Sequence, residues 1–111
     1  MNIKAFVKDW LEKSNAYDTK GYLEKWRKDA ILDDPSVGQE FKNHSGIKKY
    51  FESYFIGYKT QTKLEKLEIT SENEANIEVE FTGQFPEGKI RGTFHFIFKN
   101  GKIDKALANL L

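Results

Sequence analysis

The stretch ANIEVEFTGQFPEGKIRGTFHFIFKNGKIDKALANLL, residues 75–111, contains the pattern that decides the fold. Ile77, Val79 and Phe81 alternate with glutamates, which is the period of a strand with one buried face. KIRGTFHFIFK repeats this period after the turn sequence PEG, and NG at 100–101 predicts a two-residue hairpin into KIDKALANLL. With the looser alternation of TKLEKLEIT upstream, the pattern predicts four strands in an antiparallel meander.

The upstream half of the chain has helical periodicity instead. IKAFVKDWL and HSGIKKYFESYF carry apolar residues at i, i+3, i+4 and i+7, the stripe of an amphipathic helix. Ser45 is the predicted N-cap of the second of these stretches, and Asp18 or Thr19 caps a short helix between them that includes Trp26. The predicted order is helix, helix, short strand, helix and four strands, an α+β fold with helices on one face of a sheet.

Length and composition narrow the class of protein. At 111 residues the chain fits one domain, residues 1–111, that can bury a core without disulfides. It has no cysteine, so a disulfide framework, a thiolate nucleophile and cysteine-ligated metal sites are excluded. Aromatic residues make up 14%, enough to fill a core and also to line an apolar pocket.

Charge and hydropathy bear on partners and location. The net charge is +1, so no strong field favours nucleic acid or a membrane surface, and neither is expected as a partner. The N-terminal stretch MNIKAFVKDWLEK interrupts its apolar residues with charges and resembles neither a signal peptide nor a membrane span. A cytoplasmic location is therefore the expectation.

One segment raises a question that periodicity does not answer. DAILDDPSVGQEF places Asp33 and Asp34 directly before Pro35, among hydrophobic neighbours. Asp34 can order a turn, because the residue before proline is held extended and Asp side chains bind turn amides. It can equally be a carboxylate that points into a pocket, where lost hydration makes it a better base.

The element order, together with EKWRKDAILDDPSVGQEFKNHSGIKKYF, resembles the nuclear transport factor two-like superfamily and, within it, the SnoaL-like and ketosteroid isomerase-like proteins. The resemblance covers essentially the whole chain. It rests on a tryptophan, D-A, D-P, G, F, I and Y-F pattern: Trp26, Asp29, Ala30, Asp34, Pro35, Gly38, Phe41, Ile47, Tyr50 and Phe51. It implies a cone-shaped fold, in which three N-terminal helices pack on a curved, mostly antiparallel sheet around an apolar cavity. Because this fold hosts many activities, it does not by itself define the function.

The resemblance also implies roles for individual residues. In ketosteroid isomerases the aspartate of the D-P pair is the general base, and Asp34 matches that position. Their helix-one tyrosine and their protonated acid fall at Trp10 and near Phe94, and phenylalanine cannot donate a hydrogen bond. Strand alternation places His95 on the opposite face from Phe94. We therefore expect no complete steroid isomerase site.

The predicted pocket is aromatic. Tyr54, on the apolar stripe of the third helix, is the best-placed tyrosine hydroxyl, and Trp10 offers an indole N–H. The aromatic residues predicted for the pocket wall, most of which are first of all core residues, are Trp10, Trp26, Phe51, Tyr54, Phe81, Phe94 and Phe96. Phe55, on the stripe of the third helix, is first of all a core residue.

Other functional signals are weak. His44 is read as a solvated loop residue, and His95 as a cross-strand residue facing the strand of Glu78 and Glu80. Two scattered histidines predict no metal site, and the glycines lack the spacing of a phosphate loop, so no cofactor is expected. The resemblance implies a homodimer formed through the outer sheet face, which carries Arg91, Thr93, His95 and Ile97.

Two hypotheses remain. The first is a small proton-transfer enzyme of isomerase, cyclase or hydrolase type that acts without metal on an apolar carbonyl or cyclic compound, with Asp34 as general base. The second is a non-catalytic domain of the same fold that binds a hydrophobic ligand or acts as a dimeric interaction module, with Asp34 ordering its turn.

Overall fold

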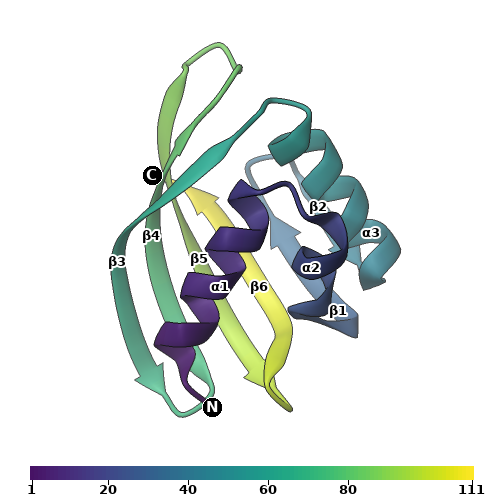
Figure 1. Cartoon of the computed structure of the whole chain (residues 1–111), viewed down its shortest axis with the longest axis vertical. Helices are drawn as coiled ribbons and strands as arrows, with labels where there is room; N and C mark the ends of the chain where they lie inside the picture. The colour runs from purple at the N-terminus through teal and green to yellow at the C-terminus, as the bar shows by residue number, and fades with distance from the viewer.

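A single sheet organises the computed structural model, which describes all residues 1–111 (Figure 1). Its six strands lie in the order β2-β1-β6-β5-β4-β3. The last four, β3 (Gln61–Ser71), β4 (Glu74–Thr82), β5 (Lys89–Lys99) and β6 (Lys102–Leu110), pair as consecutive antiparallel neighbours. This pairing confirms the meander predicted from the alternation.

The predicted hairpin at NG is also confirmed. Asn100 and Gly101 have φ values of 52° and 76° and join β5 to β6 directly. Two successive positive φ angles define the tight turn that follows the right-handed twist of paired strands, and Asn and Gly adopt them most readily.

The first strand is longer than expected. β1 (Trp26–Asp34) spans nine residues, pairs antiparallel with β2 (Gln39–Lys42) and runs parallel to β6. The short β2 was not predicted, because only Phe41 of its four residues is buried and so no alternation is visible. The sheet is therefore mixed rather than purely antiparallel.

The helices are α1 (Ile3–Asn15), α2 (Thr19–Glu24) and α3 (Asn43–Phe51). The Asp18 side chain caps α2 by accepting a hydrogen bond from the Gly21 amide at 2.9 Å. This confirms one of the two caps predicted for that helix.

Two helix boundaries differ from the prediction. Trp26 lies in β1 rather than in α2, because the Ile103 amide donates to the Lys25 carbonyl at 2.9 Å and draws the chain into the sheet. α3 begins before Ser45, and its N-cap Lys42 makes no side-chain cap. Its first turn is instead tied to β1 by His44 Nε2, which donates to the Trp26 carbonyl at 2.8 Å.

The helices cover one face of the curved sheet (Figure 1). In that view α1 crosses in front of the sheet, and α2 and α3 lie next to α1, near β1 and β2. Between the two layers lies one cluster of 23 buried hydrophobic residues. Its largest fully buried side chains include Trp10, Tyr22, Trp26, Phe51, Phe94 and Phe96. The α+β cone-shaped fold is thus confirmed. No helix combines the length and the apolar character that crossing a membrane requires.

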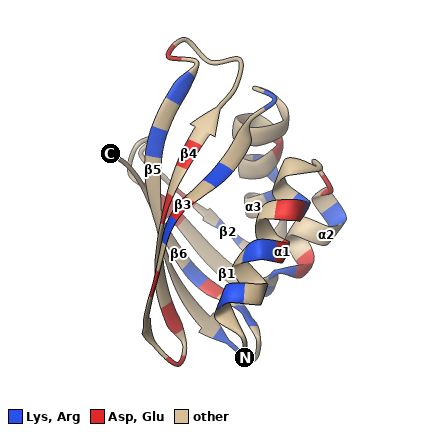
Figure 2. Ribbon diagram, turned by 60° about the vertical axis from the view of Figure 1, so that its left-hand side comes forward, with Lys and Arg blue, Asp and Glu red and all other residues tan.

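The opposite face of the sheet carries polar side chains that pair with one another. His95 packs there between Asn76, at 2.6 Å, and Glu74, at 3.3 Å, both on β4. Arg91 pairs with Glu78 at 3.3 Å. His95 therefore faces the predicted strand but contacts different residues of it. Figure 2 shows that acidic and basic residues are interspersed along the helices and strands.

Candidate functional site

A cavity of about 250 Å³ opens between the C-terminal end of the α3 region and the ends of β4 and β5. Helical residues and the turn after them form one wall, and the sheet forms the other. The loops that follow β1 and β4 form the mouth. The lining side chains are mostly apolar and include Tyr50, Tyr54, Phe55, Tyr58, Phe81, Phe85, Ile90, Phe94 and Ala108.

A change of helix type shapes the helical wall. After Phe51 the chain continues as a π-helical turn, η1 (Glu52–Ile56), closed by the Gly57 amide donating to the Glu52 carbonyl at 2.8 Å. The wider turn presents both Tyr54 and Phe55 to the cavity beside Tyr50. Single π-helical turns of this kind occur frequently at functional sites.

Asp34 is the buried acidic group of this cavity. It is the last residue of β1, its exposed fraction is 6%, and it lies on the cavity wall. Its Oδ1 accepts hydrogen bonds from the Ser36 amide at 3.0 Å and from the Ser36 hydroxyl at 2.5 Å. Asp34 therefore orders the turn before Pro35 and also lies on the wall of the cavity, and its role as a base stays a prediction.

Tyr50 is electrostatically coupled to Asp34. Burial raises the pKa of Tyr50 well above its usual value, and the charge of Asp34 and a side-chain hydrogen bond with it raise that pKa further. The phenol therefore keeps its proton at neutral pH and is a hydrogen-bond donor beside the carboxylate.

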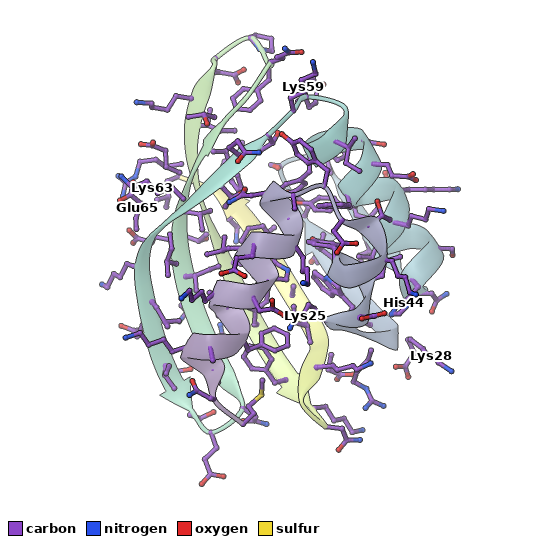
Figure 3. All side chains as sticks on the ribbon, in the orientation of Figure 1. Lys25, Lys28, His44, Lys59, Lys63 and Glu65 are labelled. Atoms are coloured by element: carbon purple, nitrogen blue, oxygen red, sulfur yellow. The ribbon has the colours of Figure 1, made fainter.

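The cavity contains no basic side chain. Although the chain has 18 lysine and arginine residues, none of them, and neither histidine, lines the cavity. Lys59 lies in the chain between the lining residues Tyr58 and Thr60, but its side chain is exposed (Figure 3). Asp34 takes part in none of the ion pairs of the structure.

Of the residues predicted for the site, the structure brings Asp34, Tyr54, Phe81 and Phe94 together around the cavity. Phe55, which the sequence assigned to the core stripe of the third helix, joins them. These residues come from β1, η1, β4 and β5, so segments far apart in the sequence meet at one end of the sheet.

Four predicted pocket residues lie outside the cavity lining, and the assignment of Trp10, Trp26, Phe51 and Phe96 to the pocket is corrected here. All four are fully buried, with an exposed fraction of 0%. α1 directs Trp10 onto the sheet, where its ring meets Phe96 edge-on at 5.3 Å. The Trp10 indole N–H is buried there without a partner and is not a donor to the cavity.

The prediction underrated several lining residues. Tyr50 and Tyr58 line the cavity together with Tyr54, and the four-residue spacing of these three tyrosines, typical of one helix face, is a signal for them in the sequence. Ser36 and Phe85 come from loops, and loop side chains carry no periodic signal.

The histidines are not part of the site. His44 lies within α3 and is half-buried, which corrects its interpretation as a solvated loop residue, because its ring anchors the helix to the Trp26 carbonyl. His95 lies on the outer sheet face. No three His, Asp or Glu side chains come together in the structure as a metal centre would require.

The comparisons with known proteins agree with this architecture. A sequence model of the SnoaL-like domain matches residues 7–106, which is most of the chain. The protein therefore belongs to the SnoaL-like domain family, within the nuclear transport factor two-like fold. A search of curated proteins found no match.

Solved structures share the fold at low sequence identity. A candidate polyketide cyclase from Sinorhizobium meliloti superposes with a TM-score of 0.85 at 17% identity, covering 94% of this chain and 93% of that one. The epoxide hydrolase/cyclase-like enzyme SalBIII of salinomycin pyran formation gives 0.84 at 18%, covering 97% and 89%. A Mycobacterium tuberculosis protein in complex with estradiol-17beta-hemisuccinate gives 0.80 at 15%, covering 94% and 89%.

Proposed function

We propose that the protein binds an apolar small molecule in the cavity and that Asp34 acts there as a general base. The observation that carries this proposal is the buried Asp34 carboxylate on the wall of an aromatic cavity, beside the protonated phenol of Tyr50. A cavity is the usual place for a small ligand, and a base must lie within reach of the proton it removes. The steroid derivative bound by one structural neighbour supports the same class of ligand.

The chemistry would be proton transfer at carbon. Asp34 would take a proton from a C–H bond next to a carbonyl, and negative charge would develop on the carbonyl oxygen. That charge needs hydrogen-bond donors within the cavity. The phenols of Tyr54 and Tyr58 line it and can fill the role that the prediction gave to Trp10.

The test uses 5-nitrobenzisoxazole, an activated carbon acid. A base removes the ring proton, the N–O bond breaks, and a coloured cyanophenolate is released. We expect catalysis above the buffer rate and a loss of about 100-fold or more in kcat/KM for Asp34→Asn. Asp33→Asn is the matched control, since Asp33 is the neighbouring carboxylate and lies outside the cavity, and its kcat/KM should stay within about two-fold of the parent.

The outcome separates this proposal from the second candidate function, a non-catalytic ligand-binding domain. That alternative is favoured by the two hydrogen bonds from Ser36 to Asp34 Oδ1, which give the carboxylate a role in its own turn. A parent protein without activity above background, or an Asp34→Asn variant as active as the parent, would favour it.

Homodimerisation through the outer face of β5 remains a prediction. Arg91 and His95 on that face are paired with glutamates of the same chain, which leaves Ile97 and the half-buried Thr93 as less polar neighbours. We expect a dimer in sedimentation velocity, and a monomer at high protein concentration would contradict this prediction.

A further inference from the structure

The geometry points to a ligand that carries a positively charged nitrogen, held against the Asp34 carboxylate and the aromatic wall of the cavity. This inference rests on the proposed small-molecule site and names the chemical class of its ligand. An apolar body would fill the cavity, and the cationic nitrogen would lie at the Asp34 end.

The first observation is a buried carboxylate without a counter-ion. Asp34 is 94% removed from solvent, yet no lysine, arginine or histidine lies within ion-pair distance of it. The groups that hydrogen-bond to it, Ser36 and the phenol of Tyr50, are neutral. Buried charges in proteins are usually paired, so the missing partner is expected to come from the ligand.

The second observation is the aromatic wall. Seven of the 18 lining residues are aromatic: Tyr50, Tyr54, Phe55, Tyr58, Phe81, Phe85 and Phe94. Faces of aromatic rings attract cations, and cages of such rings are a common way to bind quaternary ammonium groups. The same aromatic rings and the carboxylate would disfavour an anionic ligand by electrostatic repulsion.

The third observation is the sign of the charges around the mouth. The other charged lining residue is Glu87, which is exposed in the loop after β4. Asp34 and Glu87 give the cavity two negative charges, although the chain as a whole has a net charge of +1. Both charged residues of the lining are therefore acidic, and within the cavity they would favour a cation over an anion.

A cationic nitrogen is compatible with proton transfer to Asp34. In an iminium compound, loss of the proton from the carbon next to the C=N bond leaves a neutral enamine. The proton moves to the carboxylate, the C–H electron pair forms the new C=C bond, and the C=N pair neutralises the nitrogen. The carboxylate that pairs with the cation is then close to the acidic proton.

The experiment compares the binding of a positively charged compound with that of its uncharged isostere. It does not require the natural ligand to be known. The two compounds are (4-hydroxybenzyl)trimethylammonium and 4-neopentylphenol, which differ only in a quaternary nitrogen or carbon atom. Affinities are measured by titration calorimetry for the parent protein and for the variants Asp34→Asn, Asp33→Asn and Tyr54→Leu.

We expect the parent to bind the cation about ten-fold or more tightly than the neutral isostere. Asp34→Asn should reduce this preference to about two-fold, and Asp33→Asn should leave it intact. Tyr54→Leu keeps the bulk of the wall but removes a ring, so it should weaken binding of the cation more than that of the neutral compound. This variant tests the inference even if Asp34→Asn does not fold.

Equal affinities for the two compounds, tighter binding of the neutral one, or no binding of the cation up to about 10 mM would overturn the inference. A preference that survives in Asp34→Asn would overturn the assignment to Asp34. These outcomes are distinguishable from failure of the proposed function, because 5-nitrobenzisoxazole is neutral and its turnover tests the base alone.

Discussion

The interior of the cone has two aromatic regions that differ in packing. In the region under α1 and α2, the rings contact one another directly: Tyr22 stacks on Phe51 at 3.9 Å, and Trp10 meets Phe96 edge-on at 5.3 Å. At the end near η1, rings also contact one another, as Tyr50 and Tyr54 do with centroids 5.6 Å apart, but there the aromatic side chains line a cavity. The first region forms the closed core, and the second forms the site.

The difference teaches that composition does not decide where a cavity forms. Both regions are built from tyrosine and phenylalanine, and the core region adds tryptophan. In the core a helix places Trp10 onto the sheet, whereas the mouth of the cavity is formed by short loops that carry Val37 and Phe85. A helix backbone fixes the directions of its large side chains, whereas a loop backbone fixes them much less.

The largest expected effect on stability comes from truncating a buried side chain of the core region. Trp10→Ala removes a fully buried side chain and should lower the free energy of unfolding by about 3 to 5 kcal/mol. Phe85→Ala, at the half-buried mouth of the cavity, should cost only about 1 kcal/mol. Urea denaturation of both variants measures the contrast, and equal losses would show that the two regions are packed alike.

The second prediction concerns alkaline pH, because each region contains one buried tyrosine. Burial raises the pKa values of Tyr22 and Tyr50 above the ordinary phenol value of 10.0. Above that pH the unfolded chain loses these protons while the folded chain keeps them. Their contribution to stability is therefore complete below pH 10 and is lost progressively as the pH rises, with a slope of about 1.4 kcal/mol per pH unit for each group.

Stability curves from pH 9 to about 11.5 test this linkage. Tyr22→Phe and Tyr50→Phe should each make the decline shallower, because each removes one group that titrates only on unfolding. Tyr58→Phe, which alters an exposed phenol, should leave the slope unchanged. A parent protein whose stability does not fall above pH 10 would contradict the burial of both phenols.

The smallest expected effect on stability concerns Asp34, the buried carboxylate of the cavity region. Asp34→Asn keeps an oxygen that can accept the hydrogen bonds from Ser36 and removes a buried charge that has no counter-ion. We expect the variant to gain about 1 kcal/mol of stability, as is common when a functional group is replaced. Asp33→Asn should change the stability by less than about 0.5 kcal/mol. A loss of stability in Asp34→Asn would mean that its charge serves the turn alone.

Much of the architecture could be predicted because its signals are local. The alternation of Ile77, Val79 and Phe81 and the NG turn define strands and a hairpin by their own geometry. The hairpin of β1 and β2 was missed because β2 is short and mostly exposed. The end of α2 was misplaced because Trp26 is drawn into the sheet by Ile103, a residue far away in the sequence.

By itself, the sequence determined the fold class, the family resemblance and the position of Asp34, since periodicity and short motifs act over a few residues. Only the tertiary structure decided which aromatic residues form the core and which face the cavity. Trp10, Trp26, Phe51 and Phe96 carry the same apolar pattern as Phe81 and Phe94, and their surroundings differ only once the sheet curves and the helices pack on it. The partners of a side chain in a packed interior come from distant segments, so a local pattern shows that a ring is buried but not what it faces.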